Sequence, residues 1–198
     1  MEWQIKIEGK RPIIMHSGSS MGNRNAISAE RAGILAKRNA DRTQADEARL
    51  AELDCYDSLW VEGSRPTVPA TALRKCIETA ARKLKQGPLV REGLIITNTE
   101  FAYDERRYGS SLAEVITNAQ FTTGVVVQRN RILRTRAMFE QPWSCVFTAD
   151  TDDELIEKDQ LVKWLDIGGR RIGLGDWRPE KSGDYGRYEM TSIVELGE

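Results

Sequence analysis

The chain has 198 residues, of which 40% are hydrophobic and 30% are charged. These values are typical of a globular protein and exclude wholesale disorder. The 29 basic and 30 acidic residues give a net charge of −1, so the chain is not a uniformly basic binder of nucleic acid with a pI above about 9.

The first half of the chain predicts one strand and two helical segments. Apolar and polar residues alternate from Trp3 to Glu8, which is the period of a half-buried strand. Residues 28–53 are rich in helix formers, with Ser28 as the expected N-cap. We therefore expect residues 19–57 to be a largely helical insertion. A second helix is predicted from Ala70 to Lys85, ending at Gly87-Pro88.

The second half predicts mainly strands, followed by one more helix. Thr151-Asp152-Asp153-Glu154 matches a capping box that opens a helix through Leu165, and Gly168-Gly169 closes it. This order predicts an α+β fold with a ferredoxin-like, RRM-like core, a mostly antiparallel sheet and two helices on one face, all within a single domain over residues 1–198. The expected strands are 93–96, 123–128, 132–138, 144–148 and 185–194.

The cysteines, Cys55, Cys76 and Cys145, are odd in number and widely spaced, which indicates neither a disulfide framework nor a zinc site. No apolar stretch approaches the ~20 residues of a membrane span, and the N-terminus lacks the pattern of a signal peptide. We therefore expect a cytoplasmic protein with reduced thiols, no cofactor, no bound metal and no membrane partner.

Residues 168–188 form the most informative segment, because glycines, cations and aromatic rings alternate in it. Dense glycine allows close backbone approach, guanidinium groups pair with phosphate oxygens, and rings stack on unpaired bases. The segment therefore favours binding of a single strand, whereas its glycine spacing matches no mononucleotide or dinucleotide motif. The alternative is a turn-rich connection whose arginines pair with nearby acids. The candidate contacts are Arg170, Arg171, Trp177, Arg178, Lys181, Tyr185 and Arg187.

Two further groups of cations are candidate contacts. Arg74 and Lys75 lie on the second predicted helix. On a strand, residues two apart share a face, so Arg134 and Arg136 are expected to project together. Arg129 and Arg131 are expected at the hairpin tip. The alternative is a solvated edge strand that its charges protect from aggregation.

His16 is the sole histidine and the one candidate general base, although no second histidine or cysteine in the sequence forms an obvious pair with it. Acidic residues of the predicted insertion, Asp41, Asp46 and Asp54, could bind a metal for phosphodiester cleavage, but such residues usually serve solubility. The pattern therefore favours a non-catalytic binding module over an enzyme.

Three segments resemble the RAMP superfamily, specifically the backbone subunits that coat guide RNA in CRISPR effector complexes. They are IKIEGKRPIIMHSG, TVPATALRKCIETAARKL and GGRRIGLGDWRPEKSGDYGRYEM, which are similar to the family's first strand, first core helix and glycine-rich loop. The resemblance implies an RRM-like core, head-to-tail homo-oligomers along single-stranded RNA or DNA, and contacts to other effector subunits.

The chain also departs from the family pattern. Pro69-Ala70-Thr71-Ala72 replaces the family's glycine-serine pair, and the early loop from Ser17 to Ile27 lacks the aspartate that some members use for cleavage. A stand-alone bacteriophage protein that coats a single strand is therefore as good an interpretation as a CRISPR subunit. The alternatives are a ribonuclease of the same superfamily and an adaptor whose arginines meet an acidic run such as Asp150–Asp159.

Overall fold

The computed structural model describes residues 1–17, 26–127 and 130–197, which form two compact units. Both units mix helices with antiparallel strands, so the expected α+β class with antiparallel sheets is confirmed. The first unit comprises Met1–Ile14, Val61–Asp104 and Phe139–Glu198, and the second comprises Met15–Trp60 and Glu105–Met138.

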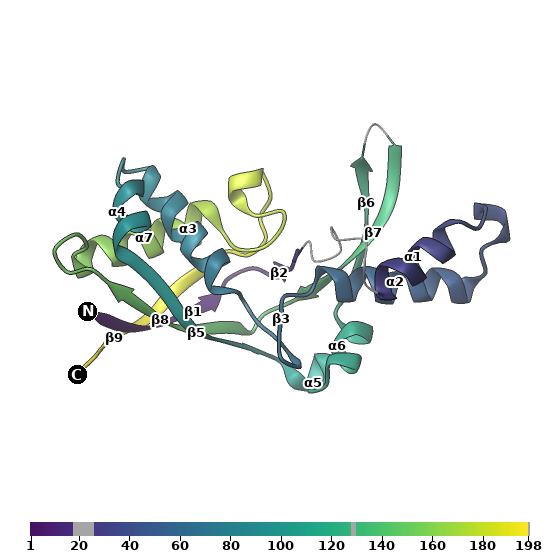
Figure 1. The fold of residues 1–198 in the computed structure, drawn as a ribbon, viewed down its shortest axis with the longest axis horizontal. Helices are drawn as coiled ribbons and strands as arrows, with labels where there is room; N and C mark the ends of the chain where they lie inside the picture. The colour runs from purple at the N-terminus through teal and green to yellow at the C-terminus, as the bar shows by residue number, and fades with distance from the viewer. Residues whose placement is uncertain (18–25, 128–129, 198) are drawn as a thin grey trace. The chain divides into compact units, whose positions relative to one another are not determined.

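The first unit contains a four-stranded sheet with the strand order β5-β8-β1-β9, in which every neighbouring pair is antiparallel. Helices α3, α4 and α7 lie on one face of this sheet (Figure 1). The elements are β1 (Glu2–Gly9), β2 (Ile13–Ile14), β3 (Val61–Glu62), β4 (Arg65–Pro66), α3 (Ala70–Arg82), α4 (Gly87–Gly93), β5 (Leu94–Tyr103), β8 (Trp143–Thr151), α7 (Lys158–Ile167) and β9 (Tyr188–Leu196).

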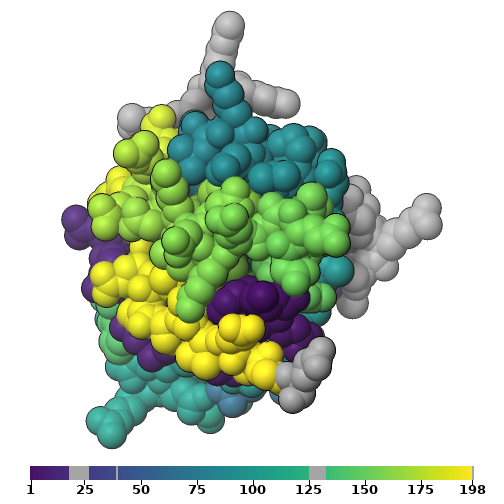
Figure 2. Space-filling view, turned by 90° about the vertical axis from the view of Figure 1, so that its left-hand side faces the viewer, coloured from purple at the N-terminus to yellow at the C-terminus, as the bar shows by residue number. Residues whose placement is uncertain are grey.

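The alternation expected for the first strand is what builds the core of this unit. Trp3, Ile5 and Ile7 are buried, and Ile5 and Ile7 stand opposite Phe147 and Cys145 of β8, which are fully buried as well. Burial of large apolar side chains contributes about 1.5–3 kcal/mol each. At the surface, the N-terminal residues, α7 and β9 lie side by side (Figure 2).

The start of the last helix differs from the sequence prediction. Thr151 ends β8, and its hydroxyl accepts from Trp3 Nε1 at 3.1 Å and donates to the Met1 carbonyl at 3.1 Å. The hydroxyl therefore joins strands instead of capping a helix, and the predicted box at 151–154 is wrong. The helix α7 instead begins at Lys158, with Glu157 and Gln160 forming the capping box.

The prediction that Gly87-Pro88 only ends a helix is incomplete. α3 ends at Arg82, and Gly87–Gly93 forms the further helix α4 with Pro88 in its first turn. Proline is tolerated there because the first N–H groups of a helix have no intrahelical partner.

The second unit contains the predicted helical segment together with the predicted hairpin. The helical segment is broken into two helices: α1 begins at Ala26, so Ser28 lies inside it, and Thr43 caps α2 through a capping box with Asp46. Asn39–Asp41 forms a 3₁₀ turn between them, because short polar side chains favour turns and caps over helix interiors. The elements are α1 (Ala26–Leu35), α2 (Gln44–Ser58), α5 (Glu105–Tyr108), α6 (Leu112–Asn118), β6 (Gln120–Val127) and β7 (Asn130–Phe139).

Ser58 joins three parts of the second unit. Its buried hydroxyl accepts the Ala137 N–H of β7 at 2.7 Å and donates to the Cys55 carbonyl of α2 at 2.7 Å. Its own carbonyl accepts the Ser17 N–H at 2.9 Å. Ser58 therefore holds together the end of α2, the strand β7 and the segment before residue 18, through its side chain and its backbone.

No helix in the described ranges is long and apolar enough to cross a bilayer.

Ser58→Ala should destabilise the protein by about 1–3 kcal/mol, because the buried Ala137 N–H loses its acceptor. Urea unfolding followed by circular dichroism measures this loss. Ser110→Ala is the matched control, since Ser110 is exposed. Equal stability of the two variants would contradict the role assigned to the hydroxyl.

Candidate functional site

The glycine-rich segment does not stop the last helix where the sequence predicted. α7 continues through a π-helical turn over Gly168–Ile172, and Gly173, with a φ of 76°, ends it. The chain then turns again at Gly175 and Gly186, whose φ values are 75° and 64°. Glycine adopts such positive φ angles without the steric cost that a Cβ brings.

The glycines are explained by contacts with this chain's own backbone. A Cβ on Gly169 would collide with the carbonyl oxygen of Tyr188, and a Cβ on Gly175 with that of Ile14. A Cβ on Gly186 would likewise meet the Leu174 carbonyl. The close backbone approach expected at the glycines therefore occurs at these three positions, and the approaching backbone is the protein's own.

Backbone hydrogen bonds hold the segment against the strand region before residue 15. The Leu174 N–H donates to the Gly186 carbonyl at 2.9 Å, and the Gly186 N–H donates to the Pro12 carbonyl at 2.7 Å. The Asp176 N–H donates to the Ile14 carbonyl at 2.8 Å. The segment is therefore a fixed platform, and its side chains are presented from a defined backbone.

Three of the five cations on this platform pair with nearby acids, as the turn-rich alternative predicted. Arg170 lies 2.8 Å from Asp166, Arg178 lies 2.7 Å from Glu180, and Arg187 lies 2.6 Å from Asp184. Exposed pairs of this kind contribute little to stability and still carry accessible N–H groups.

Arg171 and Lys181 are exposed and form no ion pair within the part of the chain that the structure describes. Trp177 and Tyr185 are half-buried, with ring centroids 6.0 Å apart and an angle of 51° between the planes. The platform therefore presents two unengaged cations and a pair of aromatic rings.

The two candidates on α3 differ in their surroundings. The Arg74 guanidinium donates to the carbonyls of Leu94 at 2.9 Å and Arg91 at 2.8 Å. It therefore fastens α3 to the next strand and helix. Lys75 is more exposed and lies 3.1 Å from Glu78.

The sheet face opposite the helices mixes polar side chains with exposed aliphatic ones such as Ile95 and Val194, and it lacks a stacking surface. Gln4 and Lys6 of β1 stand opposite Thr148 and Val146 of β8 on this face, and none of the four described strands places an aromatic ring there. RRM proteins bind bases on rings at this face. The described strands therefore place no ring on this face that could stack on a base in the RRM manner.

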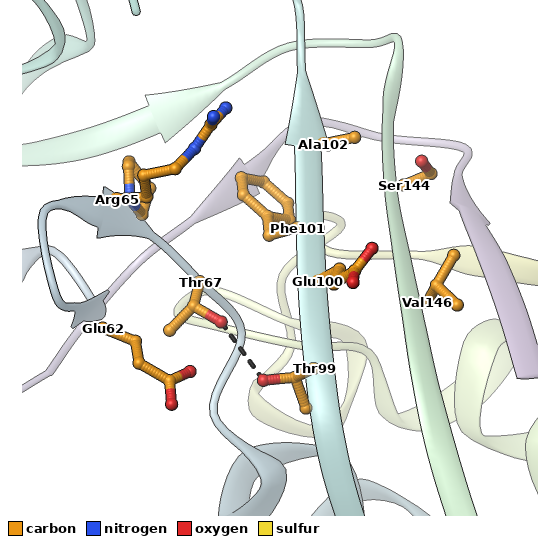
Figure 3. Close-up of a pocket in the computed structure, with 10 residues that line it drawn as sticks. Glu62, Arg65, Thr67, Thr99, Glu100, Phe101, Ala102, Ser144 and Val146 are labelled. Atoms are coloured by element: carbon orange, nitrogen blue, oxygen red, sulfur yellow. Dashed lines mark hydrogen bonds between the residues drawn. The ribbon is translucent and has the colours of Figure 1, made fainter. Parts of the chain in front are cut away.

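A cavity of about 420 Å³ lies beside the edge strand β5. Glu62 and Arg65 line it from the β3–β4 hairpin and Glu100 from β5, and Thr67 shares a hydrogen bond of 3.2 Å with Thr99 (Figure 3). Two carboxylates and one guanidinium make this lining net negative. The cavity is therefore unsuited to a phosphate group.

Two arginines of the predicted hairpin meet in the second unit. Arg134 and Arg136 line one small cavity of about 110 Å³, which confirms that they project together. Arg131 lies in β7 opposite Val126, and Arg129 lies outside the described residues. His16, Arg31, Asp54, Asp57, Ser58 and Thr135 complete the lining. No local pattern predicts this grouping, because its members come from four separate segments.

Burial and the arginines both shift the pKa values of groups in this cavity. Desolvation, then Arg136 and Arg134, lower the pKa of His16 below 6.5, while Asp57 acts in the opposite direction. Desolvation and the neighbouring Arg134 also lower the pKa of Arg136. The His16 imidazole is therefore mainly neutral at neutral pH.

The aspartates considered as metal ligands form ion pairs, and the three cysteines are buried. Asp41, Asp46 and Asp54 pair with Arg38, Lys37 and Arg31, and no cluster of three or more potential metal ligands occurs in the described ranges. Burial raises the pKa of all three cysteine thiols to about 12, which disfavours the reactive thiolate.

Comparison with known protein families found no matching family, and comparison with curated proteins found no significant match.

The glycine contacts predict opposite effects for two matched substitutions. Gly169→Ala should destabilise the protein by about 1–3 kcal/mol or more, because the new methyl group meets the Tyr188 carbonyl. Gly33→Ala should stabilise it by about 0.5–1 kcal/mol, since Gly33 lies in α1 with open space around it. Thermal unfolding measures both, and a shift of the same sign would contradict the packing described.

The lowered pKa of His16 predicts a pH dependence of stability. The unfolded chain takes up this proton near pH 6.5, but the folded protein does so only at lower pH. The free energy of unfolding should therefore fall as the pH drops below 6.5 and level off below the folded-state pKa. Urea unfolding across this range should show a weaker dependence in His16→Gln. The same slope in both proteins would exclude His16 as its source.

Proposed function

We propose that this protein binds single-stranded nucleic acid without cleaving it, through the backbone of the strand. The observation that carries the proposal is the platform of residues 168–187, whose fixed backbone presents Arg171, Lys181 and the ring pair of Trp177 and Tyr185. Cations neutralise phosphates and rings stack on unpaired bases, at about 1–3 kcal/mol per base.

The arrangement of the first unit supports a ferredoxin-like core of the RAMP type. Its main elements follow the order β1, α3, β5, β8, α7, β9, and the sheet order β5-β8-β1-β9 puts the first and third strands of that series in the centre. The platform follows the second helix of this series and precedes the last strand, which is where the resembling family has its glycine-rich loop. This agreement supports a CRISPR backbone-like or phage strand-coating protein.

Head-to-tail assembly along the strand is part of the same proposal. Asp152, Asp153 and Glu154 are exposed after β8, and the platform carries exposed cations. An acidic segment of one copy can therefore meet the cations of the next. A particle whose mass grows with strand length, measured by light scattering, would support this arrangement, and a constant one-to-one complex would contradict it.

The alternative is a ribonuclease, and one observation favours it. His16, which has a lowered pKa, lines a cavity with Arg134 and Arg136, and a neutral imidazole can accept a proton. Incubation of labelled RNA with the protein distinguishes the two functions. Intact RNA supports the binding function, whereas cleavage that His16→Gln abolishes supports the enzyme.

Arg171→Glu combined with Lys181→Glu should weaken binding of single-stranded DNA and RNA of any sequence. Each phosphate contact contributes about 0.7 to the slope of log affinity against log salt, so the loss of two contacts lowers the slope by about 1.4. Fluorescence anisotropy at several salt concentrations measures both affinity and slope.

The matched control is Lys83→Glu combined with Lys85→Glu, which makes the same change of net charge at exposed positions after α3. Its salt slope should equal that of the unaltered protein. Absence of binding to any single strand at low salt would refute the proposed function. A parallel loss of slope in the control would show that only net charge matters.

A further inference from the structure

The small cavity of the second unit is built from elements that are fixed to one another. Arg134 and Arg136 come from β7, Asp54 and Asp57 from α2, and Arg31 from α1. Arg31 Nε lies 2.6 Å from Asp54 Oδ1, which joins α1 to α2. The side chain of Ser58 joins α2 to β7.

His16 reaches the cavity from a segment that is held on both sides. The Met15 N–H donates to the Ala137 carbonyl at 2.9 Å, and the Ser17 hydroxyl donates to the Asp57 carbonyl at 3.1 Å. The side chains that line the cavity are therefore placed before any ligand arrives, which reduces the entropy cost of binding.

The cavity carries an excess of positive charge. Three guanidinium groups, from Arg31, Arg134 and Arg136, face the two carboxylates of Asp54 and Asp57. Because the pKa of His16 is lowered, its imidazole adds no full charge at neutral pH. The described residues of the lining thus have a net charge of +1, and a single negative charge would balance it.

Arg134 supplies the most specific sign of a missing acceptor. Its Nε atom is buried and makes no hydrogen bond to any described residue. A buried donor without an acceptor costs about 1–3 kcal/mol, and more when the group is charged. Arg136 lies close enough to Arg134 for the two positive charges to repel each other. An oxyanion between them would accept the hydrogen bond and relieve the repulsion.

The size of the cavity restricts the ligand to one chemical group. Cavities that enclose a whole small molecule are typically about 300–1,000 Å³, whereas this one is about 110 Å³. A tetrahedral oxyanion fits a space of this size, and a nucleoside does not. The planar guanidinium forks of two arginines match phosphate oxygens.

We propose that the cavity lined by His16, Arg31, Arg134 and Arg136 binds one phosphate group, carried by a nucleic-acid strand or by a free nucleotide. Where the phosphate belongs to a strand, this inference rests on the proposed function and adds a contact in the second unit. Where it belongs to a nucleotide, the site is independent of strand binding.

The sole histidine provides a direct measurement. The imidazole proton signals of His16 can be followed by NMR while inorganic phosphate, a nucleoside 5′-monophosphate or a 5′-phosphorylated oligonucleotide is added. Saturable shifts are expected, and bound inorganic phosphate should raise the pKa of His16 because it adds negative charge beside the ring. The charged groups facing the ring are Arg31, Asp54, Asp57, Arg134 and Arg136.

Arg134→Gln should weaken the affinity for inorganic phosphate by about 10-fold or more, since a hydrogen bond to a charged group is lost. Arg31→Gln is a second variant in case the first does not fold. Arg38→Gln is the matched control, because Arg38 is 90% exposed and lies outside the cavity. No saturable shift with any of the three probes, or equal affinity in Arg134→Gln and Arg38→Gln, would overturn the proposal.

The outcome separates this site from the proposed function. In one outcome, no probe shifts the His16 signals, and strand binding survives Arg134→Gln but is lost in the double variant of Arg171 and Lys181. The phosphate site in the cavity is then refuted, and the proposed strand binding stands. If inorganic phosphate shifts those signals while no single strand binds, the cavity stands as a nucleotide or phosphate site and the proposed strand binding fails.

Discussion

The contact between Gly169 and the Tyr188 carbonyl is the constraint on which the first unit depends. It places the π-helical turn after α7 directly against the start of β9, where the Tyr188 side chain also lies against Gly168. The same kind of contact at Gly175 packs residues 168–187 onto Ile14, and the contact of Gly186 with the Leu174 carbonyl packs the segment against itself. A loop held in this way loses little entropy when a ligand binds, because its conformation is already chosen.

Charge is sorted locally in a chain whose net charge is −1. Most arginines of the platform are paired with an acid two to four residues away, as in the pair of Arg178 and Glu180. Such pairs lower the local potential without removing the cation. The lining of the cavity in the second unit is different, because there three arginines meet two aspartates and the excess remains. The net charge of the chain is therefore close to zero although the lining of this cavity is positively charged.

Sequence patterns predicted the strand of residues 3–8, the helix from Ala70 and the hairpin with good accuracy, because each has a clear period and a long run. They failed at Thr151, whose hydroxyl could cap a helix or join strands, and the choice depends on Met1 and Trp3, about 150 residues away in the chain. No local pattern shows that carbonyl groups of α4 and β5 accept hydrogen bonds from Arg74, because these partners lie 17 and 20 residues away in the chain.

The sequence by itself determined the α+β class, the face on which β1 is buried and the segment where glycines, cations and rings alternate, since these depend on local period and composition. Only the tertiary structure decided what the glycines do and which charges meet. Close packing of Gly169 and the meeting of His16 with Arg31, Arg134 and Arg136 depend on distances between segments that are far apart in the chain. Local propensities carry no record of those distances, because burial and long-range hydrogen bonding set them.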